Sequence, residues 1–142
     1  MFTYICLGTN DPVRAARFYD AVLGALGHRR CNVSPDDPEW HNWNGWGTYE
    51  RGGAEELALW LCPPFDGGPA SPGNGAMVAL SARSWQEVER FHEAALEHGG
   101  SSEGAPGLRL QYNPDFYAAY VRDPDGNKLA AVCRGFTLPQ YT

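Results

Sequence analysis

Apolar residues recur at helical spacing in two segments of the chain. The first segment begins at Asp11 and Pro12, residue types typical of a helix N-cap and first turn, and the pattern predicts a helix that runs to about Leu26. The second begins at Ser84, and Glu87 three positions later completes a capping box. The two apolar stripes are Ala15, Phe18, Val22 and Leu26 in the first segment, and Trp85, Val88, Phe91 and Ala95 in the second.

The two helical segments belong to one repeated module. At an offset of 73 residues, Phe18 aligns with Phe91 and Gly27 with Gly100, and the same offset carries a strand pattern at residues 3–8 onto residues 76–81. The pattern therefore predicts a β-α-β-β-β module that occurs twice along the chain. The remaining strands are predicted at residues 28–32, 46–50 and 56–62 in the first half, and near residue 101, at 117–122 and at 128–133 in the second.

The repeat predicts a single α+β domain over residues 1–142, which is an ordinary length for one domain. Module one takes about residues 1–63 and module two about residues 76–135. The linker between them, about residues 63–75, is rich in Pro and Gly, which cannot continue a helix or strand. It is too short to separate two independent domains. Residues 123–127, Asp-Pro-Asp-Gly-Asn, are typical of a tight hairpin turn.

The charge of the chain limits the classes of partner. A net charge of -6 without a cluster of Lys and Arg argues against nucleic-acid binding, because phosphate backbones are recognised by clustered cations. The sequence has no run of about 18 apolar residues and no signal-peptide pattern at its start, so we expect a cytoplasmic protein without a membrane span.

The four cysteines show no metal-binding spacing. They are far apart, with no C-x-x-C motif, and no histidine stands at zinc-finger spacing. Cys6, Cys62 and Cys133 lie in apolar runs, which favours small core residues, whereas Cys31 is expected to be the exposed thiol.

Two stretches give the chain a family resemblance. Residues 8–11 (GTND) lead into 16–23 (ARFYDAVL), and residues 120–129 (YVRDPDGNKL) close the second module. With the repeat and the length, these resemble the vicinal oxygen chelate superfamily of glyoxalases, bleomycin resistance proteins and extradiol dioxygenases. The resemblance implies two curved mixed sheets that join into an incomplete barrel around a cavity. It also implies homodimers, and in metal-dependent members a divalent ion held by His, Gln and Glu.

The sequence departs from the family at every expected metal ligand. The resemblance places a first-strand ligand at Tyr4, its repeat partner at Met77 and a final-strand ligand at Ala130, and residues 57–60 offer none either. A phenol, a thioether and a methyl group cannot hold a divalent ion against water. We therefore expect no metal cofactor. If the family activity were retained, a divalent metal would support a glyoxalase I-type (lactoylglutathione lyase-like) or extradiol dioxygenase-like reaction, so enzymatic activity stays open.

A tryptophan-rich segment is the most unusual part of the chain. Residues 40–49 contain Trp40, His41, Trp43 and Trp46, a mixture of apolar area and polar tips. It fits a ligand-pocket wall, a subunit interface or ordinary core, and strand alternation predicts that Trp46 and Tyr49 face opposite ways. His41 is the best general base by residue type, and Tyr4 is the other weak catalytic candidate.

The remaining candidates for ligand contact lie in a loop and a strand. The expected loop over residues 104–115 carries Arg109, Gln111 and Tyr112, and the next strand begins at Tyr117. Long loops on a rigid sheet often hold binding groups. Arg109 suits an anionic group, and the amide of Gln111 favours hydrogen-bonding recognition. Tyr117 is either a ligand donor or an inward-facing core residue. Trp60 completes the candidate set.

These observations favour a cytoplasmic protein that binds a small aromatic or amphipathic molecule in the barrel cavity without a metal. The acidic net charge would attract a cationic ligand such as a peptide antibiotic. The alternatives are the metal-dependent lyase or dioxygenase, and an interaction module that uses the tryptophan-rich segment.

Overall fold

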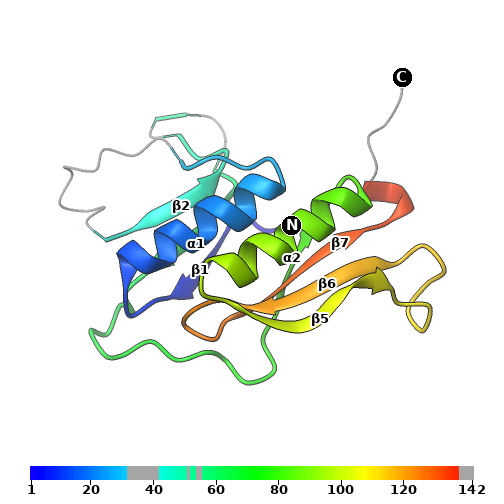
Figure 1. Ribbon diagram of the computed structural model, residues 1–142. Coiled ribbons are helices and arrows are strands. Elements are labelled where there is room, and N and C mark those ends of the chain that lie inside the picture. Colours follow the sequence, from blue (N-terminus) through cyan, green and yellow to red (C-terminus); the bar gives the residue numbers. More distant parts are fainter. Residues whose placement is uncertain (32–41, 51, 54–55, 138–142) are drawn as a thin grey trace.

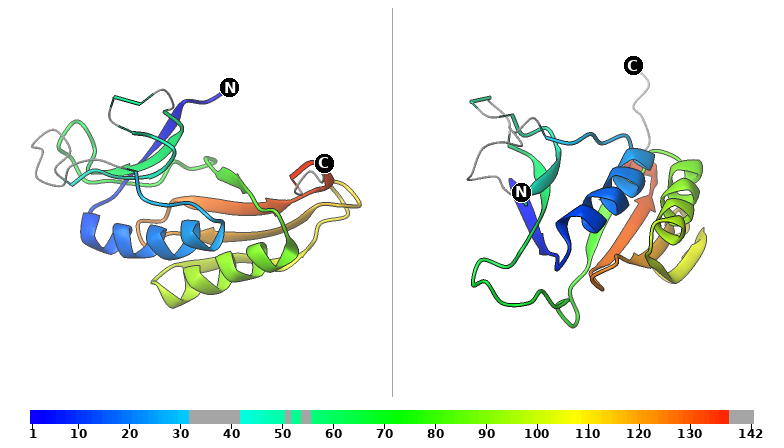
Figure 2. Two further views of the ribbon diagram at one scale, coloured as in Figure 1. Left: turned by 90° about the horizontal axis from the view of Figure 1, so that it is seen from above. Right: turned by 60° about the vertical axis from the view of Figure 1, so that its left-hand side comes forward.

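The computed structural model describes residues 1–31, 42–50, 52–53 and 56–137. Two helices lie side by side in one layer, and two separate β-sheets form a second layer that the helices cover on one face (Figure 1). Figure 2 shows both helices on the same side of the sheets. The α+β fold with mixed sheets is confirmed, and the sheets do not close into a barrel.

The first module forms a three-stranded sheet in the order β1-β3-β2. Its elements are β1 (Tyr4–Gly8), α1 (Pro12–Ala25), β2 (Asn44–Gly47) and β3 (Ala58–Cys62). The strand predicted at residues 28–32 is wrong for the part that the structure describes, where it is reduced to one bridge between Arg30 and Trp46. The ladder stops there because Gly47 has a φ of 139°, which departs from strand geometry.

The second module forms a four-stranded sheet in the order β4-β7-β6-β5. Its elements are β4 (Val78–Ser81), α2 (Trp85–Glu97), β5 (Ser101–Leu108), β6 (Tyr117–Arg122) and β7 (Lys128–Cys133), followed by a 3₁₀ helix, Gly135–Thr137. The loop expected over residues 104–115 begins instead as strand β5. An edge strand with register shifts tolerates Pro106, since its missing N–H need not enter the ladder.

The strand registers confirm the internal repeat. Strand β1 runs parallel to β3 with Cys6 opposite Trp60, and β4 runs parallel to β7 with Ala79 opposite Ala130. The two helices begin at Pro12 and Trp85, which are 73 positions apart, as the sequence predicts. Both predicted helix caps are present, because the side chain of Asp11 accepts from the backbone N–H of Arg14 and that of Ser84 from Glu87.

A close approach between the modules depends on Gly100. The aromatic ring of Phe18, fully buried on α1, lies against the start of the second module's sheet. A Cβ added at Gly100 would lie 2.7 Å from this ring and 2.6 Å from the carbonyl oxygen of Arg122. Packing therefore requires a glycine at position 100, the repeat partner of Gly27.

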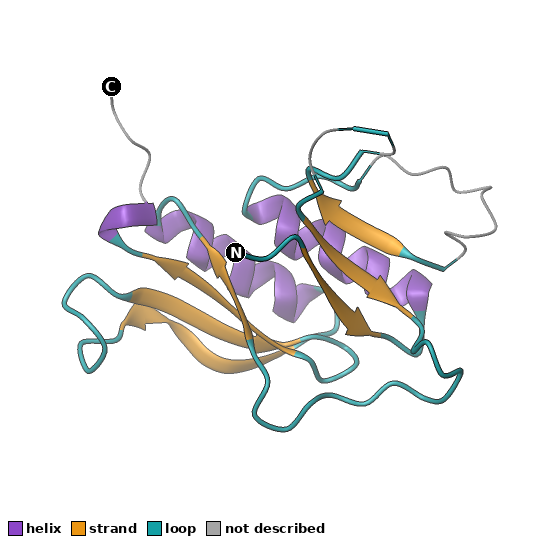
Figure 3. Cartoon of the chain, turned by 180° about the vertical axis from the view of Figure 1, so that it is seen from behind, coloured by secondary structure: helices purple, strands orange, loops and turns teal. Residues whose placement is uncertain are grey.

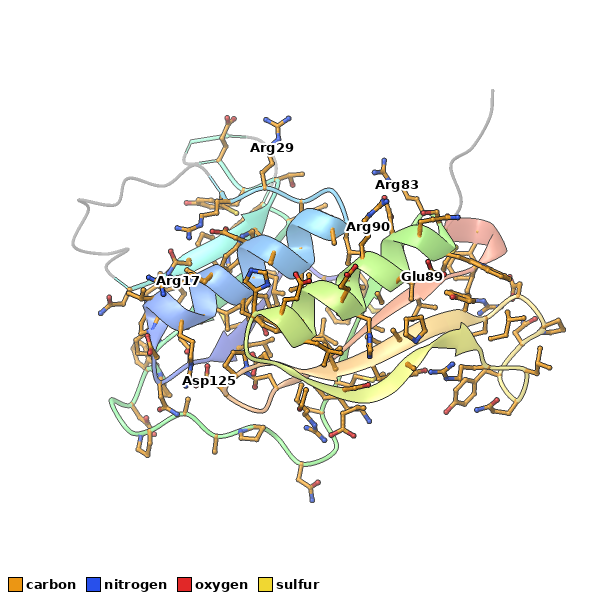
Figure 4. All side chains as sticks on the ribbon, viewed as in Figure 1. Arg17, Arg29, Arg83, Glu89, Arg90 and Asp125 are labelled. Atoms are coloured by element: carbon orange, nitrogen blue, oxygen red, sulfur yellow. The ribbon has the colours of Figure 1, made fainter. Side chains whose placement is uncertain are left out.

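Hydrogen bonds join the modules at the hairpin turn between β6 and β7. The hydroxyl of Tyr19 on α1 donates to the buried carboxylate of Asp123 at 2.6 Å. The carboxylate of Asp125 accepts from the Thr9 hydroxyl at 2.6 Å, from the backbone N–H of Asn10 at 2.9 Å and from Arg14 at 3.2 Å. Figure 4 shows Asp125 beside the N-terminal end of α1. The turn of module two therefore fixes the β1–α1 connection of module one.

Candidate functional site

One face of both sheets is left without helices (Figure 3). This face carries the residues that the family resemblance singles out. Leu59 and Leu61 of β3, and Leu129 and Ala131 of β7, lie in the core on the helix side. Because side chains alternate along a strand, their neighbours point to the opposite face. This helix-free face carries Tyr4, Cys6, Trp60 and Cys62 from the first module, and Met77, Ala79, Tyr120, Lys128 and Ala130 from the second.

The residues at the family's metal positions do not fit a divalent ion. Tyr4 and Met77 stand at the first strands of the two modules, and Trp60 and Ala130 occupy matching positions in the last strands. An indole, a methyl and a thioether offer no hard or borderline donor beside the one phenol. Within the described residues, no three His, Cys, Asp or Glu side chains come together as a metal site. No reaction step through a divalent metal follows from these residues.

A pocket of about 460 Å³ opens on the helix-free face of the first sheet, between the strands and the linker. We call it the linker pocket. Its volume lies in the range typical of small-molecule sites. The thiols of Cys6 and Cys62 lie at its floor, and Trp43 and Phe65 contribute aromatic walls. Its lining is Cys6, Leu7, Gly8, Trp43, Cys62, Pro63, Pro64, Phe65, Asp66, Pro69, Ala70 and Ser71.

Three aromatic rings meet beside the linker pocket. Trp60 is only 4% exposed, and its ring centroid lies 6.2 Å from that of Trp43 and 5.3 Å from that of Tyr49. Trp60 lies flat over Gly45 on the neighbouring strand, where an added Cβ would be 2.4 Å from the ring. The missing side chain at Gly45 therefore makes room for the indole.

Trp46 lies on the opposite side of the sheet, in the core. Its ring packs 5.5 Å from that of Tyr19, and its indole N–H donates to Asp20 at 2.9 Å. The prediction that Trp46 and Tyr49 face opposite ways is confirmed, since Tyr49 contacts Trp60 on the helix-free face. Trp40 and His41 lie outside the described residues.

Trp46 also borders a second pocket, of about 260 Å³, where the two modules meet on the helix side. Its walls are almost entirely apolar, and it is smaller than typical ligand sites. The lining comes from both modules: Ile5, Leu23, His28, Trp46, Gly47, Thr48, Leu57, Ala58, Leu59, Val78 and Leu80.

Arg109 and Lys128 lie on either side of Tyr120 on the second sheet. The guanidinium of Arg109 donates to the carbonyls of Gly107 and Ala105 at 2.9 and 2.6 Å and lies 5.5 Å from the Tyr120 ring. The Lys128 ammonium is 5.8 Å from the same ring. Burial raises the pKa of Tyr120, and the nearby Arg109 charge partly offsets this. No carboxylate of the described residues forms an ion pair with either cation.

The other predicted ligand contacts are scattered. Gln111 and Tyr112 are exposed beyond strand β5. Tyr117 faces the helices, where its ring stacks on Trp85 at 4.2 Å and its hydroxyl donates to Glu89 at 3.0 Å. Burial, followed by the hydrogen bond to Glu89, raises the pKa of Tyr117. Tyr117 is therefore an inward-facing residue, one of the two alternatives that the sequence left open.

The cysteines reverse one expectation from the sequence. All four are free thiols, but Cys6 is exposed and Cys31 is buried. Cys6 stands between two residues that face the core, so alternation turns it to the helix-free face. The backbone N–H of Cys31 donates to Gly45, which holds this residue against β2. The sequence missed the pocket role of Cys6 and Cys62 because an apolar run does not reveal which face of a strand is covered.

The comparisons with known proteins agree with this fold. The family model described as the Glyoxalase/Bleomycin resistance protein/Dioxygenase superfamily matches residues 2–131. A crystal structure of a glyoxalase/bleomycin resistance protein from Albidiferax ferrireducens is 32% identical, with a TM-score of 0.78 over 94% of this chain and 98% of that chain. No curated protein matches the chain.

Two further solved structures share the fold at lower identity. A glyoxalase-related enzyme from Fulvimarina pelagi is 20% identical, with a TM-score of 0.66 over 94% of this chain and 88% of that one. A glyoxalase I variant from Zea mays is 22% identical, with a TM-score of 0.63 over 92% of this chain but only 44% of that chain. The repeated module, the family model and the structural similarity together show that this chain belongs to the glyoxalase/bleomycin resistance protein/dioxygenase superfamily.

Proposed function

We propose that this protein binds a small aromatic or amphipathic molecule in the linker pocket without a metal ion. The observation that carries the proposal is the 460 Å³ pocket on the helix-free face, which combines aromatic walls with polar groups. Flat side chains such as Trp43 and Phe65 bury a planar ligand at low entropic cost, because each has only two side-chain torsions. Phe65 is fully exposed without a ligand, so covering its ring would gain hydrophobic free energy.

The polar groups of the linker pocket favour a ligand with one polar or cationic end. Asp66 places a carboxylate at the pocket and is itself oriented by the backbone N–H of Gly68 at 2.9 Å. Ser71 adds a hydroxyl. A carboxylate beside aromatic rings suits an amphipathic cation, and the net charge of -6 would increase its local concentration.

The described chemistry of the pocket favours binding over catalysis. Burial raises the pKa of Cys6, which a hydrogen bond from Cys62 partly offsets, and burial raises the pKa of Cys62 to about 11. Both thiols are therefore protonated at neutral pH and are weak nucleophiles. A metal-dependent lyase or dioxygenase reaction would need ligands that Tyr4, Trp60, Met77 and Ala130 do not provide.

The fluorescence of two aromatic probes, the anion 8-anilinonaphthalene-1-sulfonate and the planar cation berberine, tests the proposal. Trp43 lines the pocket, whereas Trp85 lies on α2 and stacks on Tyr117. At least one probe should give a saturable signal that Trp43→Ala weakens and the matched control Trp85→Ala keeps.

Two results would overturn the proposal. One is the absence of a saturable signal with either probe. The other is equal binding by both variants, together with a loss of oligomer in Trp43→Ala during sedimentation, which would assign the tryptophan-rich segment to a subunit contact.

A further inference from the structure

Two cysteines from neighbouring strands meet at the floor of the linker pocket. Cys6 lies in β1 and Cys62 at the end of β3, and the parallel register pairs Cys6 with Trp60 and Gly8 with Cys62. Cys6 and Cys62 are thus diagonal neighbours on the same face. Both line the linker pocket, so a small ion that enters the pocket reaches both sulfurs.

The two thiols lie on the same face of the sheet and differ in exposure. Cys6 is open to solvent, whereas Cys62 is 7% exposed. Each thiol affects the pKa of the other, after the larger effect of burial. The arrangement places a solvent-exposed cysteine beside a buried one on the same face of the sheet.

The strand register disfavours a disulfide between these residues. Neighbouring strands are about 4.8 Å apart and each residue advances about 3.3 Å, so a diagonal offset of two residues separates the Cα atoms by about 8 Å. Disulfides need Cα separations of about 4.4–6.8 Å. An ion between the sulfurs adds two bonds of roughly 2.3 Å and spans the larger gap without movement of the strands.

We propose that Cys6 and Cys62 form a two-coordinate site for a soft monovalent cation of the Cu(I) class. Soft thiolate ligands select such ions, and two sulfurs complete a linear coordination. A structural zinc site needs four ligands, and the described residues bring no third His, Cys, Asp or Glu to these two thiols. This site is independent of the aromatic ligand proposed above, although it lies in the same pocket.

Binding exchanges protons for the ion without a change in oxidation state. Two S–H bonds break, two sulfur–copper bonds form, and both protons pass to solvent. Because Cu(I) binds the thiolate forms of both residues, the ion competes with protons for the sulfurs. Affinity for Cu(I) should therefore increase with pH.

An anaerobic titration with Cu(I) in competition with the chelator bicinchoninate tests the site. The wild-type chain should withdraw one Cu(I) from the coloured chelator complex, and Cys6→Ser should lose this capacity. Cys6 is exposed, so this variant keeps the packing of the core; Cys62→Ala gives a second test at the buried sulfur. The matched control carries Cys31→Ser and Cys133→Ser and should bind Cu(I) as the wild type does.

Two further measurements separate this site from the proposed aromatic site. Trp43→Ala should keep Cu(I) binding while it weakens the response to the aromatic probes. Undiminished Cu(I) capacity in Cys6→Ser, or no capacity in the wild type, overturns the two-thiol site and leaves the aromatic proposal standing. If neither aromatic probe binds but Cu(I) binding is intact, the aromatic proposal is overturned and the two-thiol site stands.

Discussion

Removal of one hydroxyl group should show how strongly the two modules depend on each other. Tyr19 is fully buried on α1, and its hydroxyl donates at 2.6 Å to Asp123 of the second module. Burial and the neighbouring Asp123 carboxylate raise the pKa of Tyr19 well above its usual value, so the hydroxyl stays protonated and remains a donor. Tyr19→Phe keeps the ring and removes only this donor.

The expected loss follows from the surroundings of the carboxylate. Asp123 is buried and keeps three donors in the variant, from the backbone N–H groups of Asp125 and Asn127 and from the Asn127 amide, at 2.8–2.9 Å. A hydrogen bond to a charged group contributes about 1.5–3 kcal/mol, and a buried acceptor cannot replace it with water. We expect Tyr19→Phe to lower the free energy of unfolding by about 2 kcal/mol.

Urea denaturation followed by circular dichroism measures this loss, and Tyr117→Phe is its matched control. The Tyr117 hydroxyl also donates to a carboxylate, but its acceptor, Glu89, is exposed and can bind water instead. The control should lose less than about 1 kcal/mol. Equal losses in the two variants, or a loss below about 0.5 kcal/mol for Tyr19→Phe, would refute the claim that this buried contact joins the modules.

Two further predictions concern backbone space and pH. A Cβ added at Gly24 on α1 meets nothing within 4 Å, so Gly24→Ala should raise the free energy of unfolding by about 0.5–1 kcal/mol. Gly100→Ala should lower it by about 1–3 kcal/mol, because its Cβ would clash with Phe18 and the Arg122 carbonyl. Similar urea midpoints for the two variants would contradict the packing at Gly100. Burial lowers the pKa of His92 in the folded protein. The contribution of His92 to the stability of the fold is therefore present above its unfolded pKa near 6.5 and is lost as pH falls through the lower folded pKa. The melting temperature should drop less on acidification in His92→Gln than in the wild type or the control His98→Gln, and identical drops would argue against this effect.

The fold was largely predictable because its signals are local. The helix caps at Asp11 and Ser84 and the offset that aligns the modules depend on residues close together in sequence, and the structure confirms both. The errors lie where pairing depends on distant partners. Residues 28–32 were predicted as a strand, but the described part, residues 28–31, forms only the bridge between Arg30 and Trp46. Strand β5 continues through Pro106 because it lies at an edge.

The candidate site was predictable only in part, since residue type does not state which face of a strand is open. The sequence alone determined the duplicated module and the family, and it predicted that Tyr4, Met77 and Ala130 occupy the positions where the family resemblance implies metal ligands, because these inferences follow from residue identity at aligned positions. Only the tertiary structure decided that Trp46 enters the core while Cys6 and Cys62 meet in the linker pocket. Those placements depend on strand pairing and on where the linker crosses the sheet, and both join residues far apart in the chain.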